Sequence, residues 1–277
     1  MRKIVNLVNK INEHNSIGDL KTVSECKFEL ATELVEYIES HFYEMTENNK
    51  YDLANILSFV PNEFYFILED RLKSGFSARK IILLELYKYL PSPAKFRELM
   101  KTALNDGDAY VRATAVKVIG QMTDDKYIAN IMQLLYDSDK RVVSNTLEAL
   151  EELDFSSKKT VLLRYKNDSH NRVKATSLKL LWQAGHRDIM EPLKDMFSSN
   201  DEKMIASAFW VLSTIDFPMQ KVLTLAEKFA KVSSRLIRIS VIKTLIKREP
   251  TLVDTFIKNN FSNSDILTAL NELRYVS

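Results

Sequence analysis

The chain has 277 residues, of which 45% are hydrophobic, 27% are charged and only five are glycine, so a disordered chain is excluded. The formal net charge of +2 joins two unlike regions, since residues 1–70 carry 6 Lys or Arg against 13 Asp or Glu and residues 71–277 carry 33 against 24. No apolar run approaches the roughly 20 residues that cross a bilayer, so no membrane insertion is predicted. The single cysteine, Cys26, excludes an internal disulfide. Because the N-terminus also lacks a signal-peptide pattern, we expect a cytoplasmic protein.

Residues 1–60 predict an N-terminal helical cap. Within them, residues 18–45 predict one long helix, because apolar residues recur at helical spacing: Leu20, Val23, Phe28, Leu30, Leu34, Ile38 and Phe42. A second, less regular helix is indicated by Tyr51, Ile56 and Phe59. An end repeat must present a polar outer face to stay soluble, which is the role that we expect of this acidic region.

Residues 61–248 predict a repeat array with a period of about 31 residues. Similar segments recur at positions that we call markers: Val111, Val142, Val173, Met204 and, after 33 residues, Ile237. Three residues before each marker stands a predicted helix N-cap, and four of the five are good capping residues: Asp108, Asp139, His170, Asp201 and Ser234. An additional marker helix is indicated by Ala78, Arg79, Ile82, Leu83 and Leu86.

Each marker helix carries an apolar stripe at positions zero, four, five and eight, as in Val111, Ala115, Val116 and Ile119. Second helical segments lie between the marker helices, at residues 127–136, 159–165, 189–197 and 222–229. A helix pair of this size cannot bury both faces alone, so neighbouring pairs must stack. The predicted fold is therefore an all-α solenoid, closed by helices within residues 249–277 and forming one continuous unit.

The first clear repeat carries a family resemblance. Asp106-x-Asp108-x-x-Val111-Arg112-x-x-Ala115, followed by Ile119 and Gly120, resembles the second half of a HEAT repeat of the short bacterial type that phycobilisome-lyase-like proteins also contain. The resemblance covers about residues 93–248. It implies an ion-pair ladder between adjacent repeats, using Asp106, Asp137 and Asp168 with Arg112, Lys174 and Arg238. The ladder should be incomplete, because Val143 and Ile205 occupy the basic position in two repeats.

The outward positions of the marker helices predict a partner-binding face. With the apolar stripe buried, positions three, six and ten should point away from the core, and in HEAT arrays such helices line the concave surface. Position three holds Thr114, Asn145, Thr176, Ser207 and Ser240, and position six holds Lys117, Glu148, Lys179, Trp210 and Lys243. These rows would let an extended ligand approach the backbone between long side chains.

Trp210 is the predicted anchor, because Phe209, Val211 and Leu212 already supply its helix with core residues and exposed tryptophan is a common anchor at interfaces. The alternative is that Trp210 packs over the rim of its own repeat or against Trp182. Trp182 stands at position nine, where Gly120 stands in an earlier repeat, and we expect it to act as a wedge between repeats.

These features favour a non-enzymatic scaffold that binds another protein. No catalytic, metal or cofactor motif is found, since the four histidines form no ligand pair and no glycine-rich phosphate loop occurs. Gly120 is interpreted as a turn or helix-end residue. The alternative function is nucleic-acid binding by basic residues of the third repeat, with Lys158, Lys159, Arg172 and Lys174 as contacts. HEAT-like alkylpurine DNA glycosylases resemble the chain in fold alone, and their catalytic arrangement does not match it residue by residue.

Overall fold

The computed structural model describes residues 2–4, 6, 9–10, 13, 20–57, 61–89, 97–153, 158–253 and 255–274. These residues form α-helices and short 3₁₀ turns (η), without a β-strand among them, and the helices pack in neighbouring pairs. The all-α solenoid predicted from the sequence is confirmed. The chain divides into two compact units, unit 1 at Met1–Asp154 and unit 2 at Phe155–Ser277. Among the described helices, none combines the length and apolar character needed to cross a membrane.

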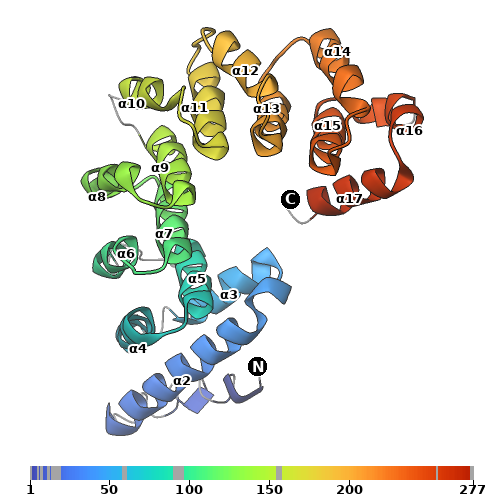
Figure 1. The fold of residues 1–277 in the computed structure, drawn as a ribbon. Helices are drawn as coiled ribbons and strands as arrows, with labels where there is room; N and C mark the ends of the chain where they lie inside the picture. The colour runs from blue at the N-terminus through green and yellow to red at the C-terminus, as the bar shows by residue number, and fades with distance from the viewer. Residues whose placement is uncertain are drawn as a thin grey trace. The chain divides into compact units, whose positions relative to one another are not determined.

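In unit 1, marker helices α5, α7 and α9 lie side by side, while α4, α6 and α8 form a second row (Figure 1). The elements are α2 (Leu20–His41), η1 (Phe42–Glu44), α3 (Glu47–Leu57), α4 (Pro61–Ser74), α5 (Ser77–Leu86), η2 (Tyr87–Tyr89), α6 (Arg97–Leu104), α7 (Ala109–Met122), η4 (Asp125–Tyr127), α8 (Ile128–Gln133), η5 (Leu134–Tyr136) and α9 (Lys140–Glu152).

The long helix predicted near the N-terminus is confirmed as α2 with η1. Its buried stripe includes Leu30, Leu34 and Ile38, but Phe28 is 51% exposed and does not belong to it. In α3, Tyr51 is likewise exposed, and Phe59 of the same predicted stripe lies outside the described residues.

In unit 2, marker helices α11, α13 and α15 lie side by side with the closing helix α17, and α10, α12, α14 and α16 each pack against one of them (Figure 1). The elements are α10 (Lys158–Tyr165), α11 (Asn171–Gln183), α12 (Met190–Phe197), α13 (Glu202–Thr214), α14 (Met219–Ala230), α15 (Arg235–Arg248), η6 (Pro250–Val253), α16 (Phe256–Asn260) and α17 (Asn263–Arg274). Each second helix predicted from residue 127 onward is present.

The marker helices begin where capping chemistry predicts. Asp108, Asp139 and Asp201 each accept a hydrogen bond from the backbone N–H two residues later, and Ser234 accepts one from the N–H of Ile237. His170 stands at the same place but makes no capping bond with its side chain. From α7 to α15, all residues of the predicted stripe are buried apart from the half-buried marker of α13, Met204, whereas Ala78, at the marker position of the additional helix α5, is exposed. The repeat register was therefore read correctly from the sequence.

The ladder between repeats is present at Arg112 and takes a bidentate form. Its guanidinium Nε and Nη2 lie 2.7 and 2.8 Å from the carboxylate oxygens of Asp137 in the next repeat. Its Nη1 donates to the backbone carbonyls of Asp106 and Gly107, just before its own helix. One side chain thus joins the start of α7 to the start of α9.

Arg238 repeats this geometry at the end of unit 2. It donates to the carbonyls of Val232 and Ser233 and to the carboxylate of Asp265, 2.9 Å away. Asp265, only 2% exposed, also receives Arg235 at 3.1 Å. Sequence reasoning missed Asp265, because it lies inside the first turn of α17 rather than five residues before a marker. It also missed the pair between Lys80 and Asp106, at 2.7 Å.

Gly120 has a different role from the one predicted. It lies within α7, whose C-cap is Thr123, a residue in the left-handed conformation with φ of 50°. A Cβ atom added to Gly120 would lie 2.8 Å from the Cα of Ala149 in α9. Glycine is therefore needed for the close approach of α7 and α9, not for a turn.

Candidate partner-binding face

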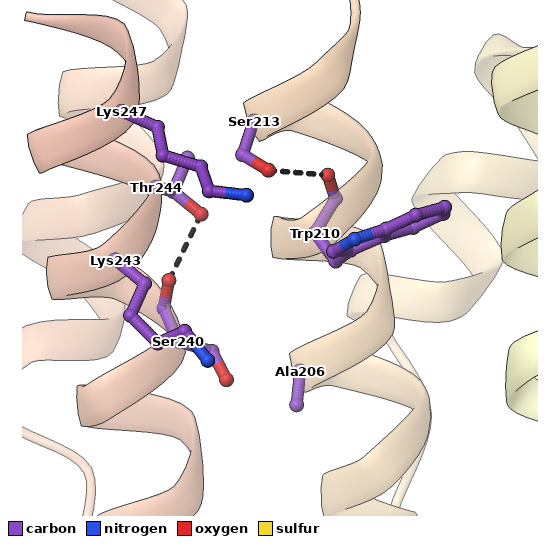
Figure 2. A pocket seen from close by; sticks show the side chains of 7 residues that line it. All are labelled: Ala206, Trp210, Ser213, Ser240, Lys243, Thr244 and Lys247. Atoms are coloured by element: carbon purple, nitrogen blue, oxygen red, sulfur yellow. Dashed lines mark hydrogen bonds between the residues drawn. The ribbon is translucent and has the colours of Figure 1, made fainter. Parts of the chain in front are cut away.

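The candidate site lies on the marker helices of unit 2, where Lys179 of α11 and Trp210 of α13 meet. The ammonium Nζ of Lys179 lies 5.7 Å from the centroid of the Trp210 ring, within cation–π range. Trp210 is half-buried. Figure 2 shows its ring directed away from α15, so ring and ammonium meet on the side of α13 that faces α11.

Trp182 takes a separate position at the end of α11. Its ring meets Phe217 edge-on with centroids 6.3 Å apart, and the guanidinium carbon of Arg187 lies 4.0 Å from the Trp182 centroid. Because Phe217 follows α13, Trp182 contacts the next repeat, in agreement with the predicted wedge. It is Phe217, and not Trp210, that Trp182 is seen to meet among the described rings.

A small cavity of about 60 Å³ lies on the other side of α13, facing α15. The lining residues are Ala206, Trp210, Ser213, Ser240, Lys243, Thr244 and Lys247 (Figure 2). Two lysines and three hydroxyl-bearing residues are therefore among the lining residues, and no acidic residue is.

The hydroxyl groups of the cavity already use their hydrogens. Ser213 donates to the carbonyl of Trp210 at 2.7 Å, and Ser240 donates to that of Leu236 at 2.9 Å. The Thr244 hydroxyl lies 2.9 Å from the carbonyls of both Phe209 and Ser240. Since a hydroxyl has one hydrogen to give, the donor that this cavity offers to a ligand is a lysine ammonium, that of Lys247.

Two lysines of the predicted row already face carboxylates. The ammonium of Lys117 lies 2.9 Å from Glu85 of α5, and that of Lys243 lies 3.0 Å from Glu272 of α17. The first pair joins α7 to α5, and the second joins α15 to the closing helix α17. Such exposed pairs contribute little stability and can exchange partners with a ligand. Glu148 of α9, in unit 1, is half-buried.

Two predicted contacts are wrong because their residues are buried. Thr176, expected to point outward, is 1% exposed, and Lys174, expected to reach a phosphate, is 8% exposed. The simple division into inward and outward positions ignored the flanks of each helix, which in a row of helices face neighbours. For lysine, the long aliphatic stem makes this burial tolerable.

The remaining predicted residues occupy mixed positions. Ser207 is half-buried and receives a hydrogen bond from the Asn171 amide at 2.7 Å, which joins α13 to α11. Lys159 in α10 and Arg172 in α11 are exposed, and the Lys158 side chain lies outside the described part of the chain. The proposed phosphate contacts are therefore divided between two rows of helices. Within the described residues, no cluster of three or more His, Cys, Asp or Glu side chains could hold a metal ion.

Comparison with known proteins places the similarity in the repeat array. The model of the family described as Cnd1, non-SMC mitotic condensation complex subunit 1, matches residues 94–208. This segment contains α6 to α12 and the first half of α13, where the 31-residue period is most regular. No curated protein matches the chain. The stacked helix pairs and the match to this HEAT-repeat family together support a HEAT-repeat protein.

Proposed function

We propose that this protein is a non-enzymatic scaffold that binds a segment of another protein on the face formed by α11, α13 and α15. The half-buried Trp210 beside Lys179 is the observation that carries this proposal. We also propose that the protein is cytoplasmic and that its repeats are of the short bacterial, phycobilisome-lyase-like type. Its cap (residues 1–60), array (61–248) and closing helices (249–277) would act as one scaffold.

The core of α13 is complete without Trp210. Phe209, Val211 and Leu212 are fully buried, and the Phe209 ring packs against Phe197 and Phe229 with centroids 5.0 and 5.4 Å apart. A further large aromatic side chain on the opposite side of the helix adds little to this core. Half-buried tryptophan offers a wide apolar surface with few rotatable bonds, which suits a binding anchor.

Capture from host lysate with the wild-type chain and Trp210→Ala, before and after nuclease treatment, tests the proposal. We expect a protein that survives nuclease and that binds Trp210→Ala at least about 30-fold more weakly, as for an interface hot spot. Tyr136→Ala is the matched control, because Tyr136 is an exposed aromatic residue of unit 1.

Thermal melting of the same variants separates binding from folding. Trp210→Ala should melt close to wild type if the ring serves a partner. A large drop in melting temperature would assign Trp210 to the core, and unchanged capture by Trp210→Ala would remove it from the interface.

Nucleic-acid binding is the second candidate, favoured by the charge of unit 2, whose residues 155–277 contain 20 Lys or Arg against 12 Asp or Glu. A phosphate-binding surface would respond more to Lys179→Glu and Arg172→Glu than to Trp210→Ala, and its ligand would be released by nuclease or moderate salt. That result would replace the protein scaffold with nucleic-acid binding and make a glycosylase assay the next step.

A further inference from the structure

We propose that the segment bound at this face is acidic, with an Asp or Glu carboxylate in the cavity between α13 and α15 and an apolar side chain against Trp210. This inference rests on the proposed function and names the chemistry of the partner. Three observations support it: the composition of the cavity, the distance between the cavity and the Trp210–Lys179 contact on the other side of α13, and the charge of unit 2.

The cavity selects a negative group. Lys243 and Lys247 supply its only charged lining groups, and Figure 2 shows the Lys247 ammonium directed from α15 toward α13. The ammonium of Lys243 already contacts the carboxylate of Glu272 in α17 at 3.0 Å, so Lys247 is the donor on which the inference rests. A carboxylate in the cavity would therefore meet the Lys247 ammonium, whereas a lysine or arginine side chain would be repelled.

The distance between the Trp210–Lys179 contact and the cavity limits the length of the recognised segment. Trp210 and Lys179 meet on the α11 side of α13, and the cavity lies on its α15 side. In a row of packed helices, places on the two sides of one helix are separated by one interaxial distance, about 8–10 Å. An extended chain advances about 3.3 Å per residue. An apolar residue and an acidic residue two or three positions apart would therefore reach the Trp210 ring and the cavity at once.

The surface of α13 between the Trp210 ring and the cavity allows a bound peptide to pass over the helix. Ala206 and Ser240 are small residues at the cavity, so a peptide backbone can approach the helices there. The excess of 20 basic over 12 acidic residues in unit 2 would also attract an acidic chain over longer range. Among protein segments, these features favour one with carboxylates over a neutral or basic one.

A random dodecapeptide library, displayed on phage and selected against the full-length chain, tests the inference without knowledge of the partner. Enriched peptides are synthesised and titrated against wild type, Trp210→Ala, Lys247→Glu and Lys228→Glu. Lys228 is the matched control, because it is an exposed lysine on α14, in the other row of helices, and its replacement changes the net charge equally.

We expect enrichment of a Phe, Leu or Trp two or three positions from an Asp or Glu. Lys247→Glu should weaken these peptides about fivefold, as for the loss of an exposed charge pair, while Lys228→Glu should leave them unchanged. Replacing the acidic residue of the peptide with Asn or Gln should weaken binding to wild type by a similar factor and to Lys247→Glu very little.

The outcomes separate this inference from the proposed function. Peptides that need Trp210 but lack an acidic residue, or that ignore Lys247→Glu, would overturn the acidic segment and leave the scaffold standing. A library without any Trp210-dependent peptide overturns both. Displacement of the peptides by a single-stranded oligonucleotide of equal length, at lower concentration than the free peptide requires, would instead assign the face to nucleic acid.

Discussion

The α7–α9 contact of unit 1 and the α13–α15 contact of unit 2 join the same kind of helices in different ways. In α7–α9, Gly120 faces Ala149 so closely that even one added carbon would clash. In α13–α15, a cavity with two lysines separates parts of the helices. Both contacts include side-chain bonds to the neighbouring backbone, from Asn145 to Ala113 in one and from Thr244 to Phe209 and Arg248 to Leu212 in the other.

The difference shows how a repeat protein divides its work. At equivalent positions, two repeats can pack closely or can leave a cavity open to a ligand, depending on the size of the side chains that face each other. The sealed contact also carries the bidentate pair of Arg112 with Asp137, which has no counterpart at position one of α13, where Ile205 stands. We therefore expect substitutions in the α7–α9 contact to reduce stability. Substitutions at the cavity between α13 and α15 should instead reduce binding.

The largest effect should follow from Gly120→Val. The added carbons would push α9 away from α7, and overpacking of this kind costs about 3 kcal/mol of unfolding free energy. Urea unfolding followed by circular dichroism measures it. Both tryptophans, Trp182 and Trp210, lie in unit 2, so their fluorescence should report a smaller change than the dichroism of the whole chain.

Gly107→Ala provides the control for this substitution. No atom lies within 4 Å of a Cβ placed on Gly107, so its replacement should change stability by no more than about 0.5 kcal/mol. If Gly120→Val were as mild as Gly107→Ala, the α7–α9 contact would be adaptable and the contrast with α13–α15 would disappear.

An intermediate effect should distinguish the two arginines of the ladder. Arg112→Ala leaves Asp137, whose side chain is 6% exposed, without its guanidinium, and removal of one partner of such a pair costs about 3 kcal/mol. Arg238→Ala leaves Asp265 with Arg235, so we expect a loss nearer to about 1.5 kcal/mol. Denaturant unfolding of both variants checks this order. Equal losses would mean that Arg235 does not replace its neighbour.

The sequence predicted the repeat register, the N-caps and the core stripe because each depends on residues within one helix or its first turn. Ser234 and Asp139, for example, act through their own backbone neighbours. What it did not predict depends on contacts between helices. Gly120 was misread because its role is set by Ala149, and Asp265 was missed because its partners are Arg235 and Arg238, about 30 residues away.

The candidate site shows the same limit. The position-six row was identified from spacing, and Trp210 with Lys179 does come together. Thr176 was misplaced because helical periodicity separates inside from outside but does not show which flank a neighbouring helix will cover. Lys247, which belongs to the cavity, lies at position ten, a row that was expected to point outward, and the spacing alone did not show that it would face α13.

The smallest predicted effect concerns acid stability, where the two units should also differ. Hydrogen bonds from the Arg141 guanidinium, which outweigh the effect of burial, lower the pKa of Asp139 to about 2. In Asp137, burial favours a higher pKa, but the bonds from Arg112 prevail and lower it. The pKa values of Glu47 and Asp108 in unit 1 are lowered by their hydrogen bonds as well, foremost those to Lys50 and Ser77 respectively.

In the described part of unit 2, Asp265 is the carboxyl group with a lowered pKa, where the bonds from Arg238, Ser262 and Arg235 outweigh burial. A carboxyl group with a lower pKa in the folded state contributes its full stabilisation above the unfolded pKa, near 4, and loses it as the pH falls toward the folded value. Since unit 1 holds more such groups, circular dichroism should begin to change at a higher pH than tryptophan fluorescence.

Asp139→Asn isolates one of these groups, because asparagine remains a good N-cap but carries no charge. Allowing for solvent screening, we expect it to lower stability at neutral pH by about 1 kcal/mol and to flatten the decline between pH 4 and pH 2. The two stability curves should converge as the pH falls below about 2, where wild-type Asp139 becomes mostly protonated even in the folded state. Parallel curves would show that the pair with Arg141 does not stabilise the start of α9, and the acid sensitivity of unit 1 would then rest on Asp137 and its bidentate partner.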